Sequence, residues 1–336
     1  MTSALLEINN LRTSFRVEGE YFAAVDGVTF TVNKDEVFAI VGESGCGKSA
    51  MALTITRLHN QNYTRFEGEI LFHGSGQGKD ILQMTPAELS KVRGGEISMI
   101  FQDPLTAFNP LHRIGAQIDE ALYYHTNLDK ADRKARTIEL LTLVGMVNPE
   151  LTYKSFPHEL SGGMRQRAMI AMAISCKPDL VIADEPTTAL DVTIQAQILD
   201  LLRNLRSETG GSMILITHDL GVVAEMADRV AVMYAGQIVE TAPVKELFAN
   251  PKHPYTRSLL NSIPSAISEA ERLQTIQGVV PSLKNLPRTG CRFARRTPWI
   301  DPSVHEEEPT LKEVSPGHLV RCSCYKHFYF PDGREV

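Results

Sequence analysis

The feature that most constrains this chain is a glycine-rich loop that follows a short apolar run. Residues 37–41 read VFAIV, and residues 42–49 read GESGCGKS. The loop matches G-x-x-x-x-G-K-[ST], in which backbone amides, a lysine and a hydroxyl bind the phosphates of a nucleotide. Gly-Lys-Ser can also be a simple turn at the start of a helix. The strand-like run before it and the helical pattern after it favour a nucleotide phosphate site.

The chemistry of this loop follows from its residue types. Glycine permits positive φ angles that bring backbone N–H groups close to an anion, and a helix that begins near Lys48 points its positive dipole end at the same place. We expect Lys48 to bind the β- and γ-phosphates and the Ser49 hydroxyl to ligate Mg²⁺. The residues predicted to bind the nucleotide here are Gly42, Glu43, Ser44, Gly45, Cys46, Gly47, Lys48, Ser49 and Ala50.

Composition excludes several classes of protein. With 336 residues, 43% hydrophobic and 22% charged, the chain is typical of a globular protein of about two domains. A formal net charge of -6 gives no support to a general nucleic-acid binder. The first residues do not resemble a signal peptide, and no apolar run reaches the roughly 18 residues that span a bilayer. The 5 cysteines indicate a reduced cytosolic protein rather than a disulfide framework.

Strand and helix patterns alternate along the chain. Apolar periodicity predicts strands within residues 6–32 and at 68–72, 98–101, 180–183 and 213–216. Helical patterns cover residues 48–58, 114–145 and 193–206, and residues 74–78 have the composition of a loop. Residues 229–239 are typical of a hairpin that turns at Ala235-Gly236. We therefore predict an α/β fold with a parallel sheet and a helical insertion over about residues 95–175.

Further polar residues follow the predicted strands. Asp184 and Glu185 come directly after an apolar strand, which suggests a Mg²⁺ ligand and a general base, although a lone Asp-Glu would be a solvated acidic turn. His218 ends the next strand, and Gln102 ends an earlier one. Ligands of open α/β sheets bind at the carboxyl ends of strands. We predict catalytic roles for Glu185, His218 and Gln102, and Mg²⁺ ligation by Ser49, Gln102 and Asp184.

The decisive motif is LSGGMRQR at residues 160–167. Alone, Ser-Gly-Gly before a helix could be a simple N-cap. Here the chain resembles the ATP-binding cassette (ABC) ATPase family in the order of its motifs: phosphate loop, glutamine loop at Gln102, signature at 160–166, Walker B strand through Glu185, D-loop at 189–191, switch histidine at His218. The resemblance implies a P-loop ABC ATPase core with an antiparallel β-subdomain, and a head-to-tail pair of such subunits with two ATP molecules between them.

Further nucleotide-binding residues follow from this resemblance. In the family, the signature of one subunit covers ATP held by the phosphate loop of the other, and an amide-rich helix N-terminus suits that role. The implied residues are Ser161, Gly162, Gly163, Gln166 and Asp191. The candidates for the aromatic residue that stacks on adenine are Phe15, Tyr21 and Phe22, of which we prefer Tyr21. The alternative is that all three pack in the core of the β-subdomain.

The C-terminal part of the chain, from Asn250 on, resembles one branch of the ABC ATPase family. Asn250 to Thr256, reading NPKHPYT, is similar to the start of the extension in ATPases of oligopeptide and dipeptide importers. We expect an ABC ATPase domain at residues 1–258 and a loop-rich extension at 259–336. Extensions of this group often bind an iron–sulfur cluster through four cysteines. Cys291 and Cys322 match two positions, Thr297 and Val304 occupy the other two, and Cys324 could replace one ligand, so we expect no cluster.

The resemblance implies a function as the ATP-hydrolysing subunit of a peptide importer, at the cytoplasmic face of the membrane. Expected partners are a sister ATPase in a heterodimer, two transmembrane permease subunits that contact residues near 102–111, and an extracytoplasmic peptide-binding protein. A nickel or other small-solute importer of the same branch is the alternative. A ribosome or DNA-repair cassette would be expected to carry a basic surface, and an ATP-trapping module would be expected to lack Glu185 or His218.

Overall fold

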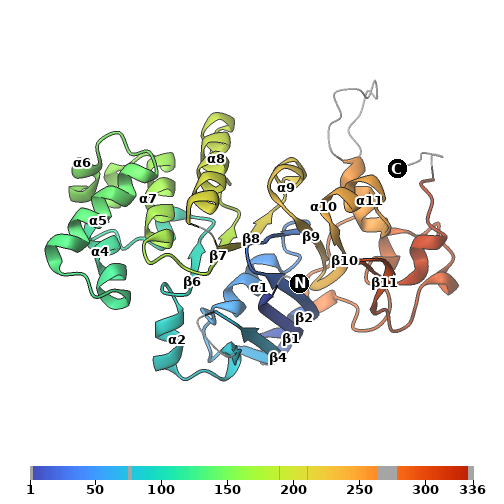
Figure 1. Cartoon of the computed structure of the whole chain (residues 1–336). Helices are drawn as coiled ribbons and strands as arrows, with labels where there is room; N and C mark the ends of the chain where they lie inside the picture. The colour runs from blue at the N-terminus through green and yellow to red at the C-terminus, as the bar shows by residue number, and fades with distance from the viewer. Residues whose placement is uncertain (1–2, 75–77, 189, 210, 263–277, 332–336) are drawn as a thin grey trace. The chain divides into compact units, whose positions relative to one another are not determined.

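The computed structural model describes residues 3–74, 78–188, 190–209, 211–262 and 278–331. Its contacts divide the chain into two compact units. We call Met1–Leu6, Val32–Glu36 and Leu71–Ile216 the first unit, and Glu7–Thr31, Val37–Ile70 and Thr217–Val336 the second unit. Figure 1 shows the elements, coloured along the chain.

The structure contains both strands and helices. The strands are β1 (Ala4–Val17), β2 (Glu20–Asn33), β3 (Val37–Val41), β4 (Thr64–Phe72), β5 (Lys79–Asp80), β6 (Ile97–Ile100), β7 (Leu180–Asp184), β8 (Ser212–Thr217), β9 (Arg229–Tyr234), β10 (Gln237–Pro243), β11 (Leu311–Ser315) and β12 (His318–Arg321). The α-helices are α1 (Lys48–Ile55), α2 (Pro86–Val92), α3 (Pro104–Ala107), α4 (Ile114–His125), α5 (Lys130–Leu143), α6 (Pro149–Lys154), α7 (Gly162–Ile174), α8 (Val192–Thr209), α9 (Leu220–Met226), α10 (Val244–Ala249) and α11 (Pro254–Asn261). The 3₁₀ helices are η1 (Ile81–Gln83), η2 (Pro157–Glu159), η3 (Leu283–Asn285), η4 (Ala294–Arg296), η5 (Pro302–Val304) and η6 (Ser323–Lys326).

The core of the first unit is a set of parallel strands. β7 pairs with β6 on one side and with β8 on the other, with Ala183 opposite Ile100 and Leu215. These strands are almost entirely buried, which fits their apolar sequences without alternation. Helices α4, α5, α6 and α7 pack against one another beside them (Figure 1, green). The parallel α/β arrangement is confirmed.

The second unit contains the strand that leads into the glycine-rich loop. β3 pairs with β9 in parallel, and β9 forms an antiparallel hairpin with β10. The predicted turn is confirmed, since Ala235 and Gly236 both have positive φ angles. β1, β2 and most of β4 belong to a separate antiparallel sheet with the order β2-β1-β4, as expected for the β-subdomain.

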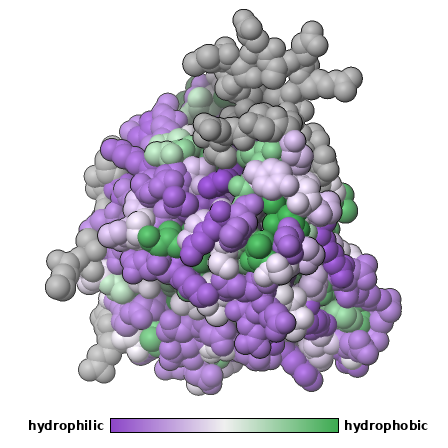
Figure 2. All heavy atoms as spheres, turned by 90° about the vertical axis from the view of Figure 1, so that its right-hand side faces the viewer, coloured by the Kyte–Doolittle hydropathy of each residue, from purple (hydrophilic) through white to green (hydrophobic). Residues whose placement is uncertain are grey.

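The C-terminal part of the chain, from Asn250 on, contains two short strands among its loops. Its prolines favoured a loop-rich appendage, but β12 pairs with β10 and β11 pairs with β12, so the part extends an existing sheet. The prolines stand mostly outside these strands, where a missing N–H breaks no ladder. The face of the molecule drawn in Figure 2, turned to view the right-hand side of Figure 1, is mostly hydrophilic, with hydrophobic residues in small groups.

The structure gives more detail on the predicted helical stretches. The helical pattern over 114–145 is two helices, because Asp129 caps the amino end of α5 by accepting from the N–H groups of Ala131 and Asp132. Within the stretch expected as the helical insertion, the strand predicted at 98–101 is β6, and the helices α3 to α7 follow it. The loop expected at 74–78 lies largely outside the described residues. Among the described residues, no helix combines the length and apolar character needed to cross a membrane.

Candidate functional site

The glycine-rich loop joins β3 to α1 in the second unit. Gly42 and Gly47 cannot be replaced without a shift of the backbone. An added Cβ at Gly42 would lie 2.1 Å from the Met233 carbonyl oxygen, and one at Gly47 would lie 2.6 Å from that of Ala24. Both also have positive φ angles. The loop therefore packs tightly against β9 and β2, and its backbone N–H groups lie at the amino end of α1.

Lys48 is the buried cation of this loop. Its side chain is only 4% exposed, and Nζ donates to the carbonyl oxygens of Gly42 at 2.8 Å and Glu43 at 3.1 Å. The ammonium group is thus held inside the curve of the loop, where it can bind phosphate oxygens. Cys46 is buried and its pKa is raised by that burial. Ser44 and Gly45 are exposed, and Ser49 and Ala50 are half-buried.

The C-terminal part reaches this loop directly. The Glu43 N–H donates to the Tyr255 hydroxyl at 2.7 Å, and Arg296 donates to the Glu43 carboxylate at 2.6 Å. Burial opposes the charge on Arg296, but its hydrogen bonds to the Glu43 carboxylate outweigh this and raise its pKa. Sequence reasoning missed both Tyr255 and Arg296. The only signal was the position of Tyr255 within the NPKHPYT run.

The ion pair between Arg296 and Glu43 predicts a role in nucleotide binding. In Arg296→Met the Glu43 carboxylate loses its cation and repels the phosphates, so we expect ATP affinity to fall about five- to tenfold. Binding of a fluorescent ATP analogue measures this. Arg295→Met is the matched control, because the neighbouring Arg295 is exposed, and Arg296→Met with Glu43→Gln should recover affinity. Equal affinity in the Arg296→Met and Arg295→Met proteins would contradict the prediction.

His218 also belongs to the second unit. It is exposed at the carboxyl end of β8. Asp219 follows and accepts from the N–H groups of Gly221 and Val222, so it caps the amino end of α9. The local structure therefore fixes the backbone next to His218 while its imidazole is accessible.

Asp184, Glu185 and Gln102 lie in the first unit, at the carboxyl ends of β7 and β6. Asp184 ends β7 and is 4% exposed. The Glu185 carboxylate accepts from Gln102 Nε2 at 3.1 Å and from Thr188 Oγ1 at 2.8 Å. Glu185 has a φ of 47°, a rare backbone conformation for this residue type that often occurs at functional sites. The structure thus brings Gln102 and Glu185 together, and Thr188 is a partner that the sequence did not identify.

The signature motif forms the start of α7. Ser161 is the N-cap and accepts from the Met164 N–H at 3.3 Å. A Cβ on Gly162 would meet no atom within 4 Å, whereas one on Gly163 would lie 3.0 Å from Ile194. Gln166 is buried, and its amide donates to the Pro186 carbonyl at 2.6 Å. Gln166 therefore connects α7 to the turn after β7, and Ser161 and Gly162 form the exposed part of the motif.

The remaining predicted residues have separate environments. Asp191 is exposed and accepts from the Ile194 N–H at 2.9 Å at the start of α8; Ala189 of the same motif lies outside the described residues. The Arg65 guanidinium lies 3.8 Å from the centre of the Tyr21 ring, so it covers one face of that ring. Phe22 is buried, and Phe15 packs edge-on against His59.

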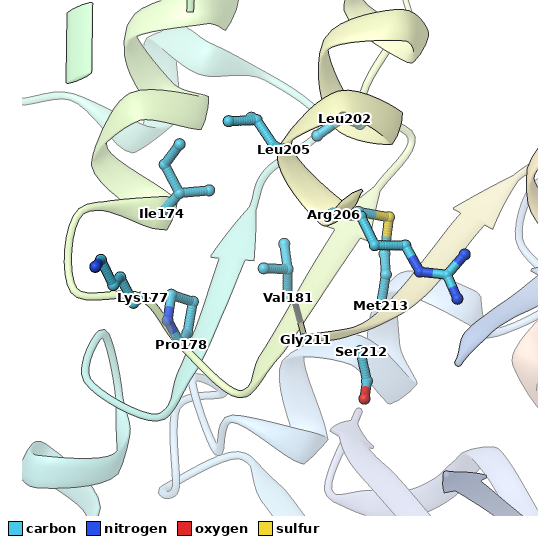
Figure 3. Close-up of a pocket in the computed structure, with 10 residues that line it drawn as sticks. All are labelled: Ile174, Lys177, Pro178, Val181, Leu202, Leu205, Arg206, Gly211, Ser212 and Met213. Atoms are coloured by element: carbon cyan, nitrogen blue, oxygen red, sulfur yellow. The ribbon is translucent and has the colours of Figure 1, made fainter. Parts of the chain in front are cut away.

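An apolar pocket in the first unit lies away from Asp184 and Glu185. It is lined by Ile174, Val181, Leu202, Leu205 and Met213, with Arg206 and Lys177 at its edge (Figure 3). Val181 and Met213 lie near the amino ends of β7 and β8. Because Asp184 and Glu185 are at the other end of these strands, the pocket does not belong to the predicted nucleotide site.

Two family models match the chain. Residues 25–188 match the model described as ABC transporter. Residues 239–301 match the model described as oligopeptide/dipeptide transporter, C-terminal region. The first match covers the phosphate loop, Gln102, the signature and Glu185, and the second covers Tyr255 and Arg296.

Similar proteins match over nearly the whole chain. The oligopeptide transport ATP-binding protein AppD of Bacillus subtilis is 50% identical over 325 residues, 96% of this chain and 98% of that protein. The oligopeptide transport ATP-binding protein OppD of Lactococcus lactis subsp. cremoris is 48% identical over 329 residues, 98% of this chain and 96% of that protein. A probable peptide ABC transporter ATP-binding protein of Sinorhizobium fredii is 49% identical over 95% of this chain and 94% of its own length.

A solved structure has the same architecture. The dimeric post-hydrolysis state of the ATP-binding cassette MJ0796, bound to ADP and Pi, superposes with a TM-score of 0.63 at 26% identity. The match covers 71% of this chain and 99% of that one.

Proposed function

We infer that this chain, which belongs to the ABC transporter family, is the ATP-hydrolysing subunit that powers import of oligopeptides or dipeptides. The observation that carries this conclusion is that one chain contains both the ABC segment and the oligopeptide/dipeptide C-terminal segment. The relatives that share both segments over nearly their full length are peptide transport proteins.

The proposed roles at the nucleotide follow from the side chains described above. Gly42 to Ala50 bind the phosphates through backbone amides, and Lys48 supplies the positive charge. Glu185 accepts a proton from the attacking water, held in place by Gln102 and Thr188. His218 contacts the γ-phosphate, and Tyr21 stacks on the adenine through the face that Arg65 does not cover.

Mg²⁺ fits the residues present. Ser49, Gln102 and Asp184 would hold it, and hydroxyl, amide and carboxylate oxygens are donors that this hard cation prefers. The Asp184 carboxylate, almost fully buried at a strand end, supports this assignment. When bound, the ion would neutralise charge on the β- and γ-phosphates.

The signature motif is proposed to act on ATP held by a second ATPase subunit, a sister chain in a heterodimer. Ser161 and Gly162 are exposed at the amino end of α7, a helix of 13 residues, so their amides and hydroxyl are available to an anion. Gly163, Gln166 and Asp191 support the same surface from α7 and α8.

Gly162 offers a sharp test of this role. Because an added side chain there meets nothing within 4 Å, Gly162→Asp should fold normally. Its carboxylate would repel the γ-phosphate across the subunit pair, so we expect ATP hydrolysis by the assembled transporter to fall at least about tenfold when both subunits carry the change. ATP binding to the isolated chain should be unchanged. Gly162→Ala is the control, and full activity of the aspartate variant would exclude the role.

The transporter partners are also part of the proposal. Leu105 and Leu111, in the segment expected to contact a permease, are 53% and 82% exposed. Exposed apolar side chains of this size support a protein contact. We propose that two permease subunits dock here at the cytoplasmic face of the membrane, supplied by an extracytoplasmic peptide-binding protein. In this proposal residues 1–258 form the ATPase domain and 259–336 the extension.

Uptake in cells tests the function. Deletion of the gene should abolish uptake of a radiolabelled oligopeptide, and the intact gene should restore it while a Glu185→Gln copy should not. Uptake of ⁶³Ni²⁺ in the same strains tests the alternative importer. Loss of nickel uptake with normal peptide uptake would overturn the peptide assignment.

A further inference from the structure

Four potential metal ligands converge in the C-terminal part, all within the second unit. They are Cys291, His305, Cys322 and Cys324, and their ligand atoms all lie within 4.8 Å of one another. We call these four residues the Cys₃His cluster. None of the three cysteines is in a disulfide. Sequence reasoning counted only cysteines, so it found one ligand too few for a closed site.

Short local structures bring these donors together. His305 directly follows η5, whose start is capped by Asp301 through the Ser303 N–H. Cys322 directly follows β12 and has a positive φ of 69°, so the chain turns there. Cys324 lies two residues further on, in η6. The Ser323 N–H between them donates to Glu306 at 2.9 Å, which ties the segment of Cys322 to that of His305.

The surroundings of His305 point to a ligand. Both of its ring nitrogens are buried, and neither has a hydrogen-bond partner in the described part of the chain. Buried polar atoms without partners are costly, and each one calls for an explanation. Cys322 and Cys324 are only 2% and 1% exposed.

The cluster does not fit the four-cysteine iron–sulfur site that the resemblance suggested. Thr297 and Val304 occupy two of those four positions, and the Thr297 hydroxyl donates to the Ala294 carbonyl at 3.2 Å. The donors that do converge suit one small ion. A tetrahedral Zn²⁺ with Zn–S bonds of about 2.3 Å has its sulfur ligands about 3.8 Å apart, which the ligand atoms here, all within 4.8 Å of one another, allow. Several irons with bridging sulfides would need their ligands further apart.

We propose that Cys291, His305, Cys322 and Cys324 bind one Zn²⁺ in a closed, structural Cys₃His site. Four protein ligands leave no open position, which is the arrangement of structural rather than catalytic zinc. Three thiolates and one Zn²⁺ carry a net negative charge. Arg321, one residue before Cys322, is half-buried and donates to the carbonyl oxygens of Ile238 and Pro309, so it supplies a nearby positive charge.

The ion would connect segments that also contact the phosphate loop. Arg292 and Arg296 lie between two of the ligands in sequence. Arg292 pairs with Asp26 and donates to the Ala235 carbonyl, and Arg296 pairs with Glu43. The elements of this part of the chain, from Cys291 on, are short strands and 3₁₀ helices. Small segments of this kind commonly need a metal or disulfide for stability.

The metal content of the full chain is the first test. The protein is purified under reducing, anaerobic conditions and analysed by mass spectrometry for zinc and iron and by assay for acid-labile sulfide. We expect one zinc per chain in the wild type and in Cys176→Ser, which removes a cysteine outside the cluster. Cys324→Ser should lose the zinc. Iron with equal sulfide, or a disulfide between cluster cysteines without metal, would overturn the proposal.

Cobalt titration of the metal-free wild-type protein makes the test independent of variant folding. Co²⁺ should bind with the intense visible bands of tetrahedral coordination and a sulfur-to-cobalt charge-transfer band, and Zn²⁺ should displace it. His305→Ala should weaken Co²⁺ binding at least about 100-fold, while His305→Cys should keep tight binding with more charge transfer. Absence of these bands in the wild type would also overturn the proposal. None of these readouts depends on ATP hydrolysis or peptide uptake.

Discussion

Replacement of Glu185 by glutamine is expected to preserve ATP binding and to lower ATP hydrolysis at least about 100-fold. Glutamine has nearly the same shape and can still accept a hydrogen bond from Thr188, which lies 2.8 Å from the carboxylate. It cannot take a proton from water at neutral pH. The loss should therefore appear in the chemical step and not in the affinity for nucleotide.

Two measurements separate these effects in the assembled transporter. Phosphate release reports hydrolysis, and a fluorescent ATP analogue reports binding. Glu150→Gln is the control, since Glu150 is exposed at the start of α6. Thr188→Val should give a smaller loss, because it removes only one group that holds the carboxylate. Normal hydrolysis in Glu185→Gln would exclude Glu185 as the base.

Replacement of Lys48 by alanine is expected to have a comparably large effect for a different reason. The Lys48 ammonium group is the buried positive charge of the phosphate loop. Without it the β- and γ-phosphates lose their strongest electrostatic partner, so both affinity and hydrolysis should fall, and hydrolysis at least about 100-fold.

The same two assays test this prediction, with Lys91→Ala as the control because Lys91 is exposed in α2. Melting temperature without nucleotide checks that the loop still folds. If Lys48→Ala binds ATP as tightly as the control, the assignment of Lys48 to the phosphates is wrong.

The sequence predicted the α/β fold because its signals are local and periodic. The apolar runs at β7 and β8 have no alternation, which is typical of parallel strands buried on both faces. The turn at Ala235-Gly236 was equally clear. The pairing of β12 with β10 could not be predicted. Short strands among prolines carry little sequence signal, and β12 pairs with a strand about 80 residues earlier in the chain.

For the candidate site, too, some residues could be predicted from the sequence and others could not. Motif spacing identified Lys48, Gln102, Glu185 and Ser161 as functional candidates, since nucleotide chemistry demands those residue types in that order. It did not identify Thr188, Tyr255 or Arg296. The roles of Tyr255 and Arg296 depend on hydrogen bonds whose partners are 212 and 253 residues away along the chain.

By itself, then, the sequence determined the residues that can contact phosphate, because amide-rich loops, lysine and carboxylates act through local chemistry that a short motif contains. Only the tertiary structure decided which residues hold that loop in place, and that His305 completes a set of metal ligands with three cysteines. The physical reason is distance along the chain. A coordination site or an ion pair requires atoms within a few ångströms, and only folding brings Cys291, His305 and Cys324 that close.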